Sequence, residues 1–169
     1  MKKTLLVAVL AVAAFTASAQ TESKGRTRLS VGLEAGLPTG DAADVYSFAI
    51  GGTLKAEKPL AQSLFGTLSA GYTSLSVKEE FKDFLDAFGA IPVKAGAKYF
   101  FSPNFYGAGE IGAAFGTQKG SETSFILAPG VGISYPVSDK NDIDAGVRYE
   151  NWSNNGSIGQ IGFHVALKF

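Results

Sequence analysis

Apolar side chains alternate with small or polar ones through most of the sequence, in unusually long segments. The last segment has an apolar residue at every second position: Ile161, Phe163, Val165, Leu167 and Phe169. A period of two places such residues on one face of a β-strand. Turn-forming residues separate eight segments of this kind, which we predict to be strands: Thr27–Leu37, Ser47–Lys58, Leu64–Leu75, Ala90–Phe101, Phe105–Gly116, Thr123–Tyr135, Ile143–Asn151 and Ser157–Phe169.

The predicted strands are 9 to 13 residues long. Strands of soluble proteins average about 5–6 residues, whereas a tilted strand that crosses a membrane needs about 9–11. Beyond residues 1–19, no apolar run reaches the roughly 20 residues of a transmembrane helix. Because only helices and closed barrels satisfy their own backbone in lipid, the strand lengths indicate a transmembrane β-barrel.

Residues 1–19 have the pattern of an export signal. A pair of lysines at positions 2 and 3 precedes the uncharged apolar run Leu5–Phe15, and Ala17-Ser18-Ala19 is a small-x-small cleavage site. The alternative is a membrane anchor, but the apolar run is shorter than the roughly 20 residues that a spanning helix needs. We therefore predict a signal peptide over residues 1–19, cleaved after Ala19, and one β-barrel domain over residues 20–169.

The composition excludes several kinds of site. The chain has no Cys, which rules out disulfides, zinc–thiolate sites, cysteine nucleophiles and lipid attachment. Lys and Arg number 15, as do Asp and Glu, so the charge balance does not favour a nucleic-acid partner. Glycine-rich segments lie within predicted strands and have no helix after them, which excludes phosphate loops. We expect no metal and no cofactor, because no ligand spacing for either is present.

Alternation alone does not say which face of the barrel is inside, since a soluble ligand-binding barrel turns its apolar face inward. Here the polar faces are mostly small residues with sparse charge, and the apolar faces carry almost none. Aromatic residues gather near the strand ends, as in the interfacial girdles of membrane barrels. They are Phe65, Tyr99, Phe101, Phe105, Tyr135 and Phe169 at one end, and Phe48, Phe115, Phe125 and Trp152 at the other. We predict that the apolar faces contact lipid.

The connections predict an up-and-down topology. Short turns near Pro59–Ser63, Ser102–Asn104 and Pro136–Asp142 are expected on the periplasmic side. Connections on the outer side are expected near Pro38–Tyr46, Ser76–Gly89, Thr117–Glu122 and Trp152–Gly156. Pro129 interrupts the apolar face of one predicted strand and removes a backbone donor there, which indicates a local defect such as a bulge.

Eight strands leave an interior just wide enough for side chains, and charged residues on the polar faces are expected to fill it. The predicted lumenal network consists of Glu34, Lys55, Glu57, Lys94, Lys98, Glu110, Arg148, Glu150 and His164. Pairing across the turn at Ser102–Asn104 places Glu110 opposite Gly96, with Lys94 and Lys98 as diagonal neighbours. Our hypothesis is that Glu110 is the centre of this network. The alternative is that these residues only fill and solvate the lumen.

One segment on the outer side breaks the period of two. Phe81, Phe84, Leu85 and Phe88 have the spacing of one helical face. Ser76 and Glu79 fit a capping box at the start, and Gly89 suits the end of a helix. We predict a short helix in the second outer loop. It would either dock or gate a ligand, or pack on the barrel rim or the lipid interface.

The C-terminal segment Ile161–Phe169, the eight alternating strands and the Ala17-Ser18-Ala19 site together carry a family resemblance. In these features the chain resembles the small eight-stranded outer-membrane β-barrel proteins of Gram-negative bacteria, the OmpA/OmpX-like barrel-domain group. The resemblance implies an all-β, antiparallel, up-and-down transmembrane barrel in the cell outer membrane. It also implies that the barrel-assembly machinery recognises an assembly signal formed by Phe163, Val165, Leu167 and Phe169.

Catalysis is not expected. Small outer-membrane barrels include a lipid A deacylase and a palmitoyl transferase, and a resemblance to either requires a His near a Ser and an acid. The only His of the chain, His164, has no Ser two residues away, and the nearest predicted acid is Asp144. We predict a non-enzymatic scaffold of the cell envelope that contacts outer-membrane lipid and presents loops to an unknown external partner. A narrow conduit for small or hydrophobic solutes, as in OmpW-like proteins, and a soluble periplasmic ligand-binding barrel are the alternatives.

Overall fold

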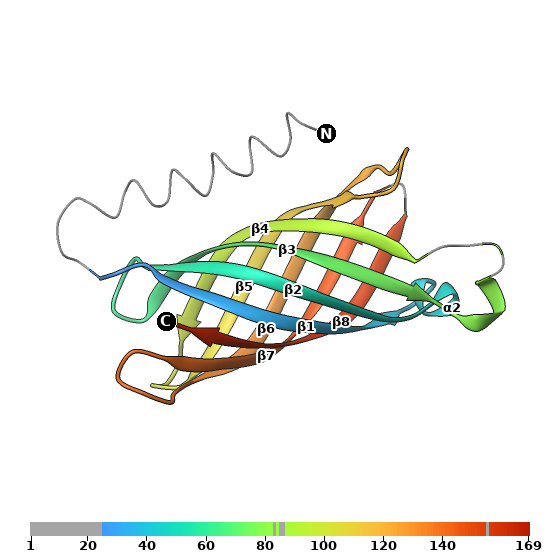
Figure 1. The fold of residues 1–169 in the computed structure, drawn as a ribbon. Coiled ribbons are helices and arrows are strands. Elements are labelled where there is room, and N and C mark those ends of the chain that lie inside the picture. The colour runs from blue at the N-terminus through green and yellow to red at the C-terminus, as the bar shows by residue number, and fades with distance from the viewer. Residues whose placement is uncertain (1–24, 83, 85–86, 155) are drawn as a thin grey trace.

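A computed structural model describes residues 25–82, 84, 87–154 and 156–169 as a closed antiparallel barrel. Each strand pairs with the next one along the chain, and β1 pairs with β8 (Figure 1). The strands are β1 (Arg28–Thr39), β2 (Tyr46–Pro59), β3 (Leu64–Val77), β4 (Phe88–Phe100), β5 (Phe105–Gly116), β6 (Thr123–Pro136), β7 (Asp142–Ser153) and β8 (Ser157–Lys168). The predicted fold class is confirmed.

The two ends of the barrel differ. At one end β1 begins and β8 ends, and three turns connect neighbouring strands; we call it the terminal end (Figure 1). The opposite end, the loop end, carries the other four connections. The first of these includes a short helix that the sequence did not predict, α2 (Ala42–Val45). Among the described residues, no helix is long and apolar enough to cross a membrane.

In the described residues of the second loop, the structure has a 3-10 turn, η2 (Glu79–Phe81), where we predicted a short helix. The predicted capping box is wrong, because Ser76 lies in β3 opposite Phe48, and Lys78 precedes the turn without a side-chain cap. Phe88 is likewise the first residue of β4. Strand β3 continues to Val77 and β4 begins at Phe88, so both strands extend into the segment where the helix was predicted. Hydrogen bonds between strands take the place of the backbone hydrogen bonds of a longer helix.

Exposure follows the period of two. On the outside, Leu33 is 74% exposed and its cross-strand partner Val165 is 59% exposed. On the inside, the side chain of Lys98 is only 1% exposed. An apolar exterior that surrounds a charged interior is the reverse of a soluble barrel and fits contact with lipid. The apolar faces therefore lie outside, as predicted.

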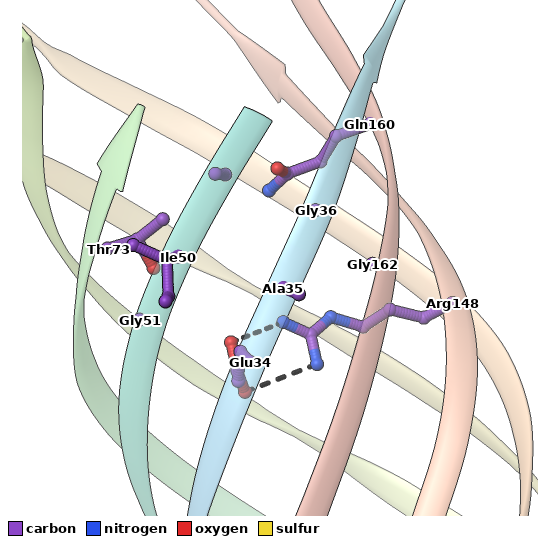
Figure 2. Close-up of a pocket in the computed structure, with 10 residues that line it drawn as sticks. Glu34, Ala35, Gly36, Ile50, Gly51, Thr73, Arg148, Gln160 and Gly162 are labelled. Carbon is purple, nitrogen blue, oxygen red and sulfur yellow. Dashed lines mark hydrogen bonds and ion pairs between the residues drawn. The ribbon is translucent and has the colours of Figure 1, made fainter. Parts of the chain in front are cut away.

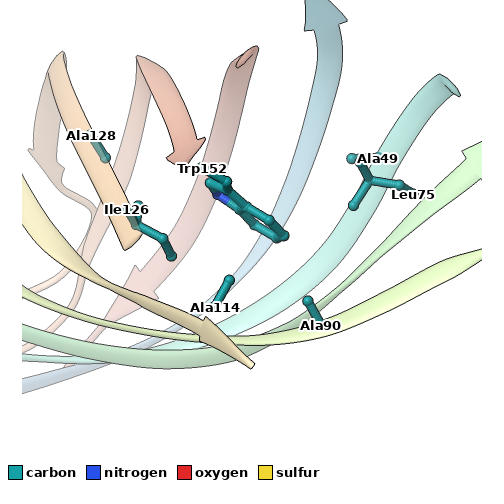
Figure 3. Close-up of a cluster of buried hydrophobic side chains, with 7 residues drawn as sticks. All are labelled: Ala49, Leu75, Ala90, Ala114, Ile126, Ala128 and Trp152. Atoms are coloured by element: carbon teal, nitrogen blue, oxygen red, sulfur yellow. The ribbon is translucent and has the colours of Figure 1, made fainter. Parts of the chain in front are cut away.

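The predicted aromatic girdles hold for most residues. Tyr99, Phe101, Phe105, Tyr135 and Phe169 are exposed at the terminal end, and Phe48 and Phe125 are exposed at the loop end. Trp152 is an error in the prediction, because it is only 2% exposed and lies inside the barrel (Figure 3). Phe65 also faces the lumen, opposite Lys98. A position near the end of a strand does not determine whether a side chain points inward or outward. Trp152 lies two residues after Glu150 on the same face of β7, and this alternation places it inside the barrel.

Two prolines interrupt hydrogen-bonded ladders without changing the register. The β6–β7 pairing runs from Leu127 opposite Asn151 to Gly130 opposite Arg148 and lacks the two pairs between them. The bulge suggested at Pro129 is therefore wrong, and the irregularity of register lies instead in β2, between Tyr46 and Phe48. The β3–β4 ladder has a similar gap beside Pro92. Since proline has no N–H group, the backbone carbonyl opposite it loses a donor.

We expect the substitution Pro129→Val to stabilise the barrel by about 1 kcal/mol. Valine restores a backbone donor opposite Tyr149 and keeps an apolar side chain towards lipid, where an unpaired carbonyl has no water to bind. The measurement is equilibrium unfolding in urea from lipid vesicles. Leu127→Val, two residues earlier on the same face, is the control and should give no gain. An unchanged or lower midpoint for Pro129→Val would contradict this explanation of the gap.

Candidate functional site in the barrel lumen

The lumen at the loop end is filled by apolar side chains. The buried cluster consists of Ala49, Leu75, Ala90, Ala114, Ile126, Ala128 and Trp152 (Figure 3). These residues come from six consecutive strands, β2 to β7, because each strand directs alternate side chains inward. Small alanines surround the Trp152 indole, which is the largest side chain of the cluster. The indole Nε1–H donates a hydrogen bond to Glu150 Oε1 at 2.6 Å and so connects this apolar layer to the charges beneath it.

The first group of charges surrounds Glu150. Its Oε2 atom accepts hydrogen bonds from Lys94 Nζ at 2.9 Å and from Arg148 Nε at 2.6 Å. The terminal nitrogens of Arg148 bind both carboxylate oxygens of Glu34, at 3.2 and 2.6 Å (Figure 2). This bidentate geometry fixes the guanidinium in one plane. The group joins β1, β4 and β7 across the interior.

A second group of charges lies nearer the terminal end. Lys98 Nζ contacts Glu57 at 2.6 Å and Asp144 at 2.7 Å. Lys168 Nζ contacts the same two carboxylates at 3.3 and 3.6 Å. The Tyr106 hydroxyl donates to Asp144 Oδ1 at 2.6 Å, and its ring centroid lies 3.9 Å from Lys98 Nζ. Each buried charge of this group therefore has an opposite charge within contact, which offsets its desolvation.

Glu110 lies opposite Gly96, as predicted, but it is not the centre of the network. Its carboxylate contacts Lys55 Nζ at 3.1 Å and accepts a hydrogen bond from the Thr67 hydroxyl at 3.1 Å. The two diagonal neighbours, Lys94 and Lys98, reach other strands instead. In a barrel this narrow, a long side chain reaches the opposite wall as easily as the adjacent strand, so the cross-strand rule does not select the partner.

The alternation of the sequence also places Asp144 and Lys168 on the inward faces, and both belong to the second group of charges. Tyr106, which the predicted network omitted, lies between Asp144 and His164. The alternation of Tyr106 with Glu110 along β5 was the signal that could have placed this tyrosine inside.

Inward-facing glycines make room for these large side chains. A Cβ atom at Gly132 would lie 2.3 Å from the Tyr106 hydroxyl. A Cβ atom at Gly146, directly opposite Gly132, would lie 2.6 Å from His164 Cε1. These two glycines thus mark positions where a side chain of another strand already occupies the interior.

Aromatic rings lie at the terminal end of the lumen. Phe100 packs against Phe65 and Tyr106, with ring centroids 5.5 Å apart in each pair. Small cavities lie among the charges of the described residues. One, of about 10 Å³, lies beside Glu34, Arg148 and Gln160, and another, of about 20 Å³, is lined in part by Glu110 and His164. Each has the volume of about one water molecule.

His164 has no serine hydroxyl bonded to its ring in the described part of the chain. Its Nε2 atom lies 3.0 Å from Asp144 Oδ1 and 3.2 Å from the Tyr106 hydroxyl. Residues 25–82, 84, 87–154 and 156–169 contain no group of three His, Asp or Glu side chains placed to bind a metal ion.

The predicted aromatic face of the second loop does not form one surface. Phe84 is 84% exposed, whereas Phe88 belongs to β4 and packs against the apolar layer of the lumen. Phe81 is half-buried in η2, and Leu85 lies outside the described residues. The four residues of the predicted assembly signal, Phe163, Val165, Leu167 and Phe169, are all exposed on the outside of the barrel.

A closed barrel of eight long strands with apolar residues outside and paired charges inside is a transmembrane β-barrel. The chain belongs to the family described as the outer membrane protein beta-barrel domain, whose family model matches residues 7–169. No curated protein sequence matches the chain. The protein is located in the cell outer membrane, so the alternative of a soluble periplasmic barrel is wrong.

Solved structures share the fold. The chain is similar to Ail, the attachment invasion locus protein of Yersinia pestis, with 20% identity, a TM-score of 0.58, and coverage of 87% of this chain and 100% of that chain. Neisserial surface protein A has 17% sequence identity and a TM-score of 0.59, and the match covers 84% of this chain and 95% of that chain. The N-terminal β-barrel domain of Pseudomonas aeruginosa OprF has 13% sequence identity and a TM-score of 0.50, and the match covers 86% of this chain and 100% of that chain.

Proposed function

We propose that the protein is a non-enzymatic scaffold of the outer membrane, with a closed lumen and outer loops that contact molecules outside the cell. The observation that supports closure is the filling of the lumen in three layers. An apolar layer around Trp152 lies at the loop end, paired charges occupy the middle, and the rings of Phe65 and Phe100 lie at the terminal end. The two lumenal cavities described above have volumes of only about 10 and 20 Å³.

Ion conduction would require several of these contacts to break together. Open porins conduct through an aqueous channel that about 16–18 strands enclose. Here side chains from strands that are not neighbours contact each other across the interior. Separating a buried pair leaves uncompensated charges, at a cost of about 3–5 kcal/mol. A closed lumen therefore fits a scaffold better than a conduit for small or hydrophobic solutes.

Planar-bilayer recording tests the scaffold against the conduit. Refolded protein, verified by its heat-modifiable gel shift, is added at increasing amounts to a voltage-clamped bilayer. We expect no reproducible conductance steps above the background of protein-free detergent. Steps whose frequency rises with the amount of folded protein, and which are absent for heat-denatured protein, would contradict the scaffold and favour the conduit.

The loop end is the surface offered to an external partner. Its exposed charged side chains are mostly acidic: Asp41, Asp44, Glu79, Glu80 and Glu122, against Lys82 and Lys119. An open groove of about 680 Å³ lies here between Phe48, Val77 and Lys78. Ail has been solved in complex with the heparin analogue sucrose octasulfate. The acidic excess of this chain disfavours a polysulfated ligand, because like charges repel.

Two further partners follow from the outside of the barrel. Outer-membrane lipid would cover the exposed apolar belt that includes Leu33, Leu54 and Ile111. The barrel-assembly machinery would recognise the exposed C-terminal residues during biogenesis, Phe169 included. Both partners are proposals that rest on the family's location in the outer membrane.

A further inference from the structure

The interface between β1 and β8, which we call the seam, differs from the other strand interfaces of the barrel. Every other pair of neighbouring strands is joined by one connection of the chain, whereas β1 and β8 are the first and the last strand. Once the ladder hydrogen bonds of the seam break, no short turn holds its two strands together. Because closing a long loop costs more conformational entropy than closing a short one, the seam is the interface that gains most from additional contacts.

The inner face of the seam carries small residues. Gly36 lies directly opposite Gly162, and Gly32 lies opposite Ala166. Pairs of side chains on facing strands are a main source of stability in a sheet. At these positions β1 and β8 therefore gain little from packing directly against each other.

Instead, three ion pairs reach over the seam from the flanking strands. Each pair joins one strand of the seam to the strand on the far side of the other, so that β1 is linked to β7 and β8 is linked to β2. The pairs are Arg148–Glu34, Arg28–Asp142 and Lys168–Glu57. We propose that these three pairs form a latch that closes the barrel and holds its first and last strands in one register.

The Arg148–Glu34 pair shows how the latch spans a strand. Arg148 on β7 is paired with Gly162 on β8, and a Cβ atom at Gly162 would lie 3.5 Å from Arg148 Cγ. The arginine side chain thus passes over this glycine and binds both carboxylate oxygens of Glu34 on β1, at 3.2 and 2.6 Å (Figure 2). Since the bidentate geometry fixes both groups, it holds β1 at one position relative to β7.

The register of the seam needs such a contact because the apolar wall does not select it. A slip by one residue would turn the apolar side chains inward, but a slip by two residues would keep them outside. The outward-facing residues of both strands are all apolar: Leu29, Val31, Leu33, Ala35 and Leu37 in β1, and Ile161, Phe163, Val165 and Leu167 in β8. A slip by two residues moves one strand by about 6–7 Å along the other and would separate all three ion pairs. Buried polar contacts that specify register have precedent in other folds.

Unfolding rates in urea, measured with the seam open and with the seam cross-linked, test the latch. The chain has no Cys, and Leu33 and Val165 lie opposite each other, so Leu33→Cys/Val165→Cys provides one disulfide across the seam. In the reduced form, we expect Glu34→Gln to speed unfolding at least about tenfold, because the seam opens first and the latch opposes this step. In the oxidised form, unfolding must begin elsewhere while the latch is still formed, so Glu34→Gln should change the rate by less than about twofold.

Glu110→Gln is the matched control, because the Glu110–Lys55 pair joins β5 to β2 and does not reach over the seam. Oxidation should not reduce the effect of this control substitution. Asp142→Asn removes the Arg28 contact at the terminal end and provides a second latch variant should Glu34→Gln fail to fold. We expect oxidation to suppress its effect as well.

Two results would overturn the proposal. One is an effect of the latch variants that is equal in the reduced and oxidised forms, or that is missing in the reduced form. The other is an equal suppression of the Glu110→Gln effect by oxidation, because the disulfide would then act on the whole barrel and not on the step that the latch opposes.

Discussion

Replacement of Lys98 by Met is expected to lower the free energy of unfolding by about 3–5 kcal/mol, the cost of removing one partner from a buried ion pair. Lys98 is 1% exposed and contacts two carboxylates, those of Glu57 and Asp144. Methionine has a similar length but no charge, so both carboxylates would share only Lys168. Equilibrium unfolding in lipid vesicles measures the loss, and the gel shift shows whether the variant still folds.

Two further variants separate this electrostatic effect from other consequences of the substitution. Lys58→Met removes a lysine from the outward-facing side of β2 and should change stability by less than about 1 kcal/mol. The double variant Lys98→Met/Asp144→Asn removes one of the two stranded charges and should recover part of the loss. If Lys98→Met unfolds like the wild type, or if the double variant is no more stable than the single one, the paired network does not stabilise the barrel.

Replacement of Trp152 by Ala is expected to cost about 3–5 kcal/mol as well, but by a different mechanism. The indole occupies the apolar layer among small alanines, which cannot close the space that it would leave (Figure 3). Glu150 Oε1 would also lose the hydrogen bond from Nε1. The measurement is again equilibrium unfolding in lipid vesicles.

Trp152→Phe is the matched control for this substitution. Phenylalanine keeps most of the apolar volume and loses only the indole donor, so we expect a smaller cost of about 1–3 kcal/mol. Equal effects of Ala and Phe would mean that the hydrogen bond to Glu150, and not the packing of the indole, carries the contribution of Trp152.

The strands could be predicted because their signal is strong and repeated. In β8, Val165 and Lys168 lie on opposite faces, and the same alternation recurs in the other strands, which are 12 to 14 residues long. All predicted boundaries fall within two residues of the observed ones. Charge then identified the inner face, because a buried Lys98 or Glu110 requires an opposite charge that lipid cannot provide.

The sequence was less informative where the outcome depends on three-dimensional proximity. The partners of Lys94 and Lys98 lie on β2 and β7, on other sides of the lumen, and no local spacing encodes this. The aromatic spacing around Phe88 fits a helical face, but pairing of Leu75 with Phe88 extends the hairpin and places Phe88 in β4. Tertiary hydrogen bonds therefore prevailed over local periodicity.

Fluorescence quenching by brominated lipids tests most directly whether charges and Trp152 lie inside a lipid-facing apolar wall. Trp152 is the only tryptophan and faces the lumen opposite Ile126, whereas the adjacent residue Leu127 faces outward. A Leu127→Trp substitution in the Trp152→Phe variant provides a lipid-facing reference at nearly the same depth. We predict strong quenching of this reference and little quenching of Trp152 in the wild type. Equal quenching of the two indoles, or stronger quenching of Trp152, would contradict the orientation of the barrel wall.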